Sequence, residues 1–287
     1  MKPAPFEYHR PISLAETFDL LDRYGEEGRI LAGGQSLVPT LNMRLVTPRA
    51  VIDINRLPGL DAIRMTPEGL VIGALVRQEA LERSPLVGEH APLIAAAVPH
   101  IGHGAIRTRG TVGGSLALAD PAAELPACAV AHDATIRVSN RQGRRDIAAP
   151  DFFRGIYTTA LEPGELVTEL VMPRATPGWR FAFEELARRH GDFALAGLAA
   201  RARIQRGRVV EARLVFFGVG AGPVRARGAE AALMDRPTDA DTLAAAGRAL
   251  DADLDPPGDI HGSPALRRQL ARVLLARVVR RLVEGAS

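Results

Sequence analysis

The chain has 287 residues, 47% of them hydrophobic and 24% charged, which is typical of a folded globular protein and excludes a disordered or fibrous one. At this length we expect two or three packed units rather than one core. No apolar run approaches the roughly 20 residues that span a bilayer, and residues 1–11 lack the apolar stretch of a secretory signal. We therefore expect a cytoplasmic protein with no membrane span.

The net charge of +3 carries little information about partners. Basic residues concentrate in the last predicted helix, at Arg267, Arg268, Arg272, Arg277, Arg280 and Arg281. We interpret them first as a solvated helix face and second as a docking surface for an acidic partner. Nucleic-acid binding is disfavoured, because aromatic residues make up only 5% of the chain and none lies among these arginines.

The first predicted unit, residues 1–57, has a clear helix start and stop. Ser13 and Glu16 form a capping box, in which each side chain satisfies a free backbone N–H of the first turn, and Gly25 ends the helix. After it we predict a strand at 29–32, a turn at Gly33-Gly34, a helix capped by Ser36, and a strand at 51–54. The turn-forming sequence Leu57-Pro58-Gly59-Leu60 marks the boundary between the first and second units.

The second predicted unit, residues 58–175, contains one long irregular segment. Residues 101–115 include five glycines and show little apolar periodicity, and loops of this length are usually functional. Around this loop we predict hairpins at 62–65 with 70–74 and at 135–138 with 144–147, helices at 78–83, 91–98 and 121–131, and a closing strand at 166–171.

The third predicted unit, residues 176–287, is a sheet followed by helices. Three apolar segments, 180–186, 195–204 and 209–219, predict a three-stranded antiparallel sheet. Helices are predicted at 226–234, 240–250 and 264–283, the last with Ser263 as its cap and Pro264 at its first position. The whole chain is therefore predicted to be an α+β protein.

Two glycine segments are candidates for binding a phosphate group. Ala32 to Ser36 follows a strand and opens a helix, and Thr111 to Ser115 ends the long loop. Backbone N–H groups that converge in a tight turn can hold a pyrophosphate, and glycine lets the anion approach. Either segment alone could serve only its turn, but the two together, with three hydroxyls, favour an anion site.

Other motifs in the sequence are weaker. Residues 102–107 and 218–223 begin like dinucleotide fingerprints but fail at the third glycine position, so a Rossmann domain is disfavoured. His100 and His103 have no cysteine or carboxylate at metal-ligand spacing, and we interpret them as loop histidines. Cys128, the only cysteine, lies in an apolar stretch and is expected to be a buried structural thiol. A chain with one cysteine cannot hold an iron–sulfur cluster.

Several segments of the sequence resemble those of a known family. The segments Ile30 to Leu37, Arg109 to Ala117 and Ala119 to Pro126 closely resemble the FAD-binding medium subunit of molybdenum hydroxylases, the family of xanthine dehydrogenase and carbon monoxide dehydrogenase. Gly191-Asp192-Phe193-Ala194 is similar to the family's segment beside the isoalloxazine ring. The resemblance covers the whole chain.

The resemblance implies a fold and a set of partners. The fold is the FAD-binding fold shared with vanillyl-alcohol oxidase, built of two α/β subdomains plus a C-terminal domain. FAD is expected to be non-covalent, because Gln35 stands where many relatives have histidine. Molybdopterin and [2Fe-2S] clusters belong to a large and a small partner subunit, expected as a dimer of heterotrimers. The chain then receives electrons from the clusters and passes them to an external acceptor.

The resemblance also implies which residues bind the cofactor, and none of them acts as a catalytic acid, base or nucleophile. They are Leu31, Ala32, Gly33, Gly34, Gln35, Ser36, Leu37, Ile101, Gly110, Thr111, Val112, Gly113, Gly114, Ser115, Leu118, Glu124, Leu166, Val167 and Asp192. Leu166 and Val167 could equally be core residues, and Glu124 a solvated helix residue. Glu184, at a position where relatives can have lysine, leaves the electron acceptor open.

Two alternatives stay open from the sequence. A stand-alone FAD-dependent oxidase or reductase would have its own substrate pocket, and steady turnover by the isolated chain would reveal it. A non-enzymatic assembly subunit would have lost its flavin and would purify without colour.

Overall fold

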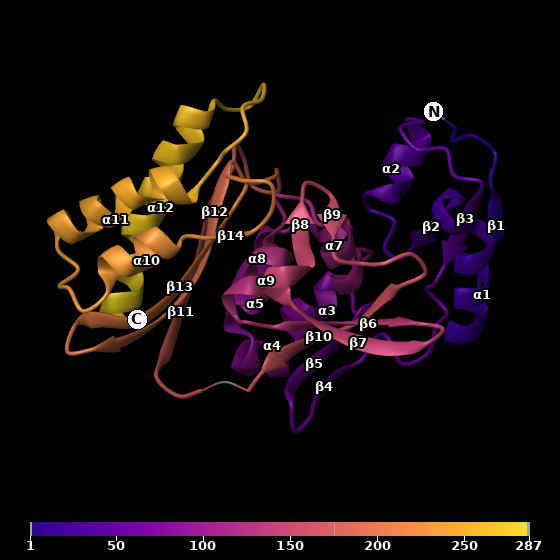
Figure 1. Cartoon of the computed structure of the whole chain (residues 1–287), viewed down its shortest axis with the longest axis horizontal. Coiled ribbons are helices and arrows are strands. Elements are labelled where there is room, and N and C mark those ends of the chain that lie inside the picture. The colour runs from indigo at the N-terminus through magenta and orange to yellow at the C-terminus, as the bar shows by residue number, and fades with distance from the viewer. Residues whose placement is uncertain (1, 175, 286–287) are drawn as a thin grey trace.

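The computed structural model describes residues 2–174 and 176–285, and each of its three main sheets belongs to a different stretch of the chain. In Figure 1 the first stretch lies at the right in indigo, the second in the middle, and the third at the left in orange and yellow. The functional candidates lie mainly in the first two stretches, so these decide the site.

The first unit is a small parallel sheet with strand order β1-β3-β2. The predicted capping box is confirmed: the Ser13 hydroxyl accepts the N–H of Glu16, and the Glu16 carboxylate accepts the N–H of Ile12, one residue before the cap. The elements are β1 (Glu7–His9), α1 (Leu14–Tyr24), the 3₁₀ turn η1 (Gly25–Glu27), β2 (Gly28–Leu31), α2 (Leu37–Asn42) and β3 (Ala50–Asp53).

The second unit is built on a five-stranded antiparallel sheet with strand order β4-β5-β10-β6-β7. Its strands are β4 (Ile63–Met65), β5 (Gly69–Gly73), β6 (Thr135–Asn140), β7 (Gly143–Ala148) and β10 (Leu166–Pro173), and a separate hairpin joins β8 (Phe153–Gly155) to β9 (Thr158–Thr159). Its helices are α3 (Gln78–Arg83), α4 (Pro85–His90), α5 (Pro92–Ala97), the 3₁₀ turn η2 (Val98–His100), α6 (Gly104–Arg107), α7 (Val112–Leu118), α8 (Glu124–Ala131) and α9 (Ala149–Phe152).

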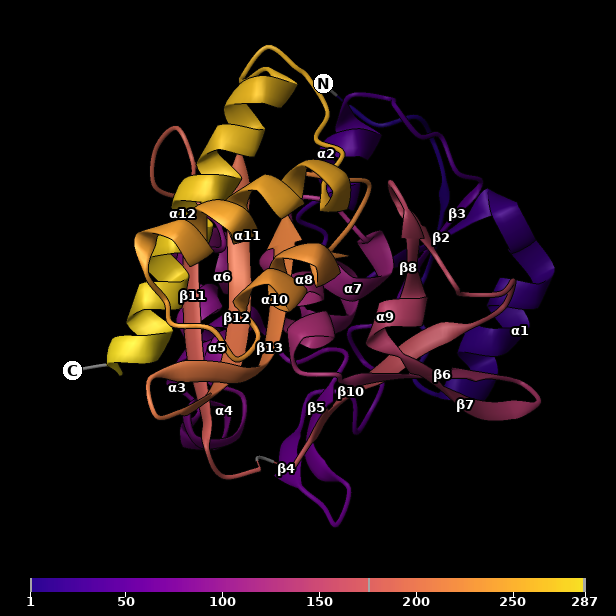
Figure 2. The same ribbon diagram turned by 60° about the vertical axis from the view of Figure 1, so that its left-hand side comes forward.

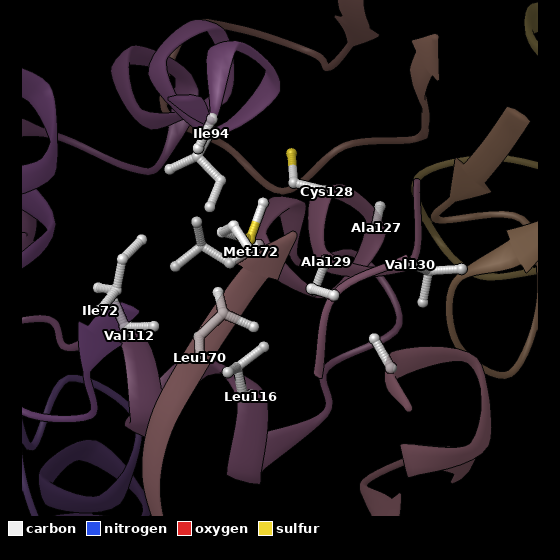
Figure 3. Packing of buried hydrophobic residues seen from close by; sticks show 14 of the residues in the cluster. Ile72, Ile94, Val112, Leu116, Ala127, Cys128, Ala129, Val130, Leu170 and Met172 are labelled. Carbon is white, nitrogen blue, oxygen red and sulfur yellow. The ribbon is translucent and has the colours of Figure 1, made fainter. Parts of the chain in front are cut away.

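The core of the second unit lies between this sheet and helices α5, α7 and α8. Figure 3 shows Ile72 and Leu170 of the sheet packed near Leu116 of α7 and Ile94 of α5. All four side chains are fully buried. Because α7 begins directly after Thr111, burial of Leu116 fixes the second glycine segment to the sheet.

The third unit is an antiparallel sheet covered on both faces. The three predicted strands are confirmed as β11 (Trp179–Leu186), β12 (Ala196–Gln205) and β13 (Arg208–Phe217), and a two-residue strand that the sequence pattern did not predict, β14 (Val224–Arg225), extends the sheet to four. Helices α10 (Arg227–Leu233), α11 (Ala240–Asp253) and α12 (Pro264–Glu284) cover one face, as Figure 2 shows. The other face packs on α5 and α8 of the second unit.

Three predictions require correction. The segment 101–115 is not wholly irregular, because it contains α6 and the first turn of α7. Ser36 precedes α2 with αR backbone angles and its hydroxyl makes no capping bond. Arg267 is not on a solvated face: it is buried and donates to the carbonyls of Leu195 and Gly218, which ties α12 to the loops at the end of the sheet.

Candidate functional site: two glycine segments

The first glycine segment connects β2 to α2 and has free backbone donors. Among the described residues, no protein group accepts the N–H groups of Gly33, Gly34, Gln35 and Ser36. Gly34 has a φ of +74°, a left-handed conformation that favours glycine. The carbonyl of Ala32 accepts a hydrogen bond of 2.8 Å from the Asn55 side-chain amide. Since the N–H and C=O of a trans peptide point in opposite directions, the N–H of Gly33 points away from Asn55.

The second glycine segment forms the start of α7, and most of its donors are already used. Thr111 is the N-cap, and its hydroxyl accepts the N–H of Gly114 at 3.1 Å. The N–H groups of Val112, Gly113, Gly114 and Ser115 are all taken, by acceptors on Val76, Ala74 and Thr111. Within the described chain, only the Thr111 N–H of this segment lacks an acceptor. Gly114 of this segment is exposed, and Ser115 is half-buried.

The fold brings the first segment into direct contact with Arg109 and Gly110, the residues that lead into the second segment. A Cβ added to Gly33 would lie 2.4 Å from the carbonyl oxygen of Arg109, the residue before Gly110. Gly110 in turn packs against Gln78, whose N–H donates to the Gly110 carbonyl at 2.9 Å. Gly33 is therefore required by the close approach of another part of the backbone, a reason that the sequence could not reveal.

A polar network that the sequence analysis missed joins these segments. Arg77 donates from one guanidinium nitrogen to the Arg109 carbonyl at 2.5 Å and from the other to Asn55 Oδ1 at 2.6 Å. The Asn55 amide also donates to Asp53 Oδ1 at 2.6 Å. No local sequence signal marks Asn55 or Arg77, because their partners lie 23 and 32 residues away, at Ala32 and Arg109.

Asp53 ends this network as a buried carboxylate. Burial by itself raises its pKa, but hydrogen bonds from Tyr8 and from Asn55, together with the nearby Arg10, hold the pKa below its usual value. Asp53 is thus kept ionised, which favours the donor role of the Asn55 amide.

Glu124, at the first position of α8, has the opposite electrostatic character. It is 8% exposed, so its alternative interpretation as a solvated helix residue is wrong. Burial raises the pKa of Glu124 to about 8, and the nearby carboxylate of Glu185 adds to the effect. The Oε2 atom of Glu185 is itself buried and has no hydrogen-bond partner among the described residues. Glu124 therefore holds a proton at neutral pH.

The remaining predicted site residues fall into two groups. Ile101, Leu166 and Val167 are buried: Ile101 and Val167 belong to the core of the second unit and Leu166 to that of the first. Leu118 is half-buried at the end of α7. Asp192 is half-buried and pairs with Arg189 at 3.0 Å. Its neighbour Gly191 packs directly against His103, which places this segment beside the 101–107 segment.

Other chemistry-bearing groups form no separate site. Cys128 is buried, as predicted, and burial raises the pKa of its thiol. Within residues 2–174 and 176–285 there is no group of three or more histidine, cysteine or carboxylate side chains that could hold a metal ion. In the same residues no helix is both long and apolar enough to cross a membrane.

Comparison with known proteins now identifies the family. Residues 4–175 match the family model of the FAD-binding domain in molybdopterin dehydrogenases, and residues 181–282 match that of the C-terminal domain of the carbon monoxide dehydrogenase flavoprotein. The chain belongs to the family of FAD-binding medium subunits of molybdenum hydroxylases. The resemblance inferred from the glycine motifs is confirmed, and the chain is an FAD-dependent oxidoreductase subunit.

Individual relatives align over nearly the full chain. The 6-hydroxypseudooxynicotine dehydrogenase complex subunit alpha of Paenarthrobacter nicotinovorans is 38% identical over 287 residues, covering 100% of this chain and 97% of the relative. The carbon monoxide dehydrogenase medium chain of Hydrogenophaga pseudoflava is 34% identical and covers 97% of each. Quinoline 2-oxidoreductase from Pseudomonas putida 86 matches in structure with a TM-score of 0.94 and 37% identity, covering 100% of this chain and 99% of that chain.

The solved structures confirm the predicted fold class as well. Carbon monoxide dehydrogenase from Hydrogenophaga pseudoflava, in a form lacking the Mo-pyranopterin moiety of its cofactor, superposes with a TM-score of 0.95 and 36% identity and covers 98% of each chain. The two-part FAD-binding fold with a C-terminal antiparallel sheet is therefore established.

Proposed function

We propose that this chain holds FAD without a covalent bond, with the pyrophosphate against the two glycine segments. The observation that carries the proposal is the run of four N–H groups from Gly33 to Ser36 that no described protein group accepts, in a turn that packs against Arg109 and Gly110, the residues leading into the second segment. Consecutive backbone donors in a glycine turn, with no acceptor among the described residues, are suited to a phosphate. Residue 35 is glutamine, which forms no covalent link to a flavin.

The other predicted site residues complete this proposal. Leu31, Leu37, Ile101 and Leu118 supply apolar surface beside the cofactor, and Leu166 and Val167 hold the surrounding core. Glu124 offers a protonated carboxyl, and Asp192 approaches the isoalloxazine edge. The units 1–57, 58–175 and 176–287 then act as two cofactor-binding parts and one C-terminal cover.

When bound, FAD supplies a group that exchanges electrons one or two at a time, and the residues of this chain bind and orient it. Electrons arrive from [2Fe-2S] clusters on a small partner subunit, which the single cysteine of this chain cannot hold. They leave to an external acceptor. Substrate hydroxylation takes place on a large subunit that carries molybdopterin. The names of the relatives support this division, since they are medium chains or subunits of dehydrogenases.

We further propose assembly as a dimer of heterotrimers in the cytoplasm. Affinity purification of the tagged chain from its host, followed by flavin absorbance, iron and molybdenum analysis, and mass measurement, tests the whole proposal. We expect flavin, iron and molybdenum to purify together in a particle that contains two copies of each chain. A yellow, metal-free single chain that turns over an organic substrate would favour the stand-alone flavoenzyme instead.

A further inference from the structure

We infer that Arg77 and Asn55 are positioning residues that hold the first glycine segment against the residues leading into the second, with the donors of the first segment directed for a pyrophosphate. This inference rests on the proposed function, and it assigns roles to two residues outside both motifs. We call Asp53, Asn55, Arg77 and the carbonyls of Ala32 and Arg109 the bracket. The bracket spans the boundary between the first and second units, since Asp53 ends β3 and Arg77 immediately precedes α3.

The bracket holds carbonyl groups, and this determines its effect on the donors. The Asn55 side-chain amide donates to the carbonyl of Ala32 at 2.8 Å, so the N–H of Gly33 in the same peptide group points to the opposite side. Arg77 donates to the carbonyl of Arg109, whose oxygen is the atom that a Cβ on Gly33 would approach most closely. One guanidinium therefore fixes the point where the first segment meets the residues leading into the second, while Asn55 fixes the direction of the first free donor.

The guanidinium is suited to this role because of its shape. Its planar fork presents several N–H donors in fixed directions, and here two nitrogens reach two acceptors that belong to different units. Lysine has a single ammonium on a flexible chain and cannot reproduce both directions at once. Burial, with the nearby Arg109, lowers the pKa of Arg77, as expected for a cation partly withdrawn from water.

The network is also anchored at its far end. Asp53 accepts from both the backbone N–H and the side-chain amide of Asn55, and its other oxygen accepts from Tyr8 on β1. Asn55 consequently has its amide orientation set by a carboxylate, with Oδ1 left to accept from Arg77. Each side chain of the bracket is a hydrogen-bond partner of another member, so loss of one member leaves a partly buried polar group without its partner.

The experiment measures FAD affinity on the full chain in wild-type, Arg77→Met, Arg77→Lys and Asn55→Ala forms. Arg83→Met is the matched control, since Arg83 ends α3, is 77% exposed and, among the described residues, pairs only with Glu79 on the same helix. We expect Arg77→Met to raise the Kd for FAD about 10- to 100-fold, the range expected for lost hydrogen bonds to a charged group. Arg77→Lys should fall between wild type and Arg77→Met.

Two further readouts separate positioning from general loss of structure. At saturating FAD, the absorbance bands of the bound flavin in Arg77→Met should match wild type, because the bracket acts on the phosphate turns. The flavin-free Arg77→Met chain should still unfold in one cooperative transition, at a midpoint somewhat below that of Arg83→Met, because Asn55 Oδ1 and the Arg109 carbonyl each lose a donor. The double variant Arg77→Met/Asn55→Ala should lose less affinity than the product of the two single effects. Arg77 and Asn55 share a hydrogen bond, so each single variant already removes it.

The inference fails if Arg77→Met keeps a Kd within about twofold of wild type. If Arg77→Met does not fold, Asn55→Ala decides instead: wild-type affinity in that variant overturns the bracket, and a tenfold loss supports it. A wild-type chain that binds no FAD refutes the proposed function itself, which distinguishes the two failures.

Discussion

The two glycine segments look alike in the sequence and differ in the structure. Among the described residues, Ala32 to Ser36 leaves four consecutive N–H groups without an acceptor, while Val112 to Ser115 uses its N–H groups to cap α7 and to bond to Ala74 and Val76, which follow β5. The first segment thus supplies unused backbone donors, whereas the second uses its donors to begin α7 and leaves Gly114 exposed. A paired glycine motif does not by itself define which role its backbone plays.

The strongest test of this difference is Gly33→Ala. The new methyl would lie 2.4 Å from the Arg109 carbonyl oxygen, so the first segment must move away from the residues that lead into the second. Overpacking and loss of the Arg77 bond together amount to about 4 kcal/mol, which predicts about a 1000-fold loss of FAD affinity. Flavin content after gel filtration measures it. Gly88→Ala, where the methyl meets nothing within 4 Å, is the control, and equal flavin retention in both variants would refute the contact.

The second test uses the opposite protonation behaviour of the two regions. Asp53, beside the first segment, has a lowered pKa, so the stability it contributes is present above its ordinary pKa and is lost as the pH falls through the lowered value. Glu124, after the second segment, has a pKa of about 8 instead of 4.5. Its folded form binds the extra proton, so its stabilising contribution is present below pH 4.5 and is lost as the pH rises through about 8.

Glu124→Gln should remove this alkaline loss, since glutamine stays neutral. We expect the flavin-free wild type to lose on the order of 3 kcal/mol between pH 5.5 and pH 8.5 relative to Glu124→Gln, because each pKa unit corresponds to about 1.4 kcal/mol. Urea unfolding at the two pH values measures the difference. Parallel pH curves for the two proteins would show that Glu124 is already ionised in the folded chain.

A third test separates support from binding in the second segment. Gly113→Ala places a methyl 2.5 Å from the Ala74 Cβ and 2.9 Å from its carbonyl oxygen, so we expect a loss of about 2 kcal/mol in the free energy of unfolding. Gly114→Ala meets only the Thr111 hydroxyl, at 2.7 Å, and Gly114 is exposed. Gly114→Ala should therefore keep most of the stability and lower FAD affinity more. The reverse ranking would mean that Gly114 faces the core.

The sequence predicted the regular elements well where a local pattern determines them. The capping box at Ser13, the two hairpins of the second unit and the helix that begins at Pro264 all depend on neighbouring residues. The family resemblance then supplied the fold and cofactor class. It could not supply the bracket, because the groups that Asn55 and Arg77 join across the two units, the carbonyls of Ala32 and Arg109, lie over 20 residues away. It could not show the occupied donors of the second segment either, since these depend on how α7 docks on β5.

The smallest predicted effect compares the two hydroxyls that the sequence had treated as equivalent. The Thr111 hydroxyl caps α7, whereas the Ser36 hydroxyl makes no capping bond to α2. Thr111→Val should cost the flavin-free chain about 1 kcal/mol of unfolding free energy, the usual value of an N-cap, because its partner Gly114 is exposed and water takes over part of the bond. Ser36→Ala should leave that free energy unchanged within about 0.5 kcal/mol. Chemical unfolding of both flavin-free variants decides the matter: equal losses would mean that the two segments begin their helices in the same way and differ only in what they bind.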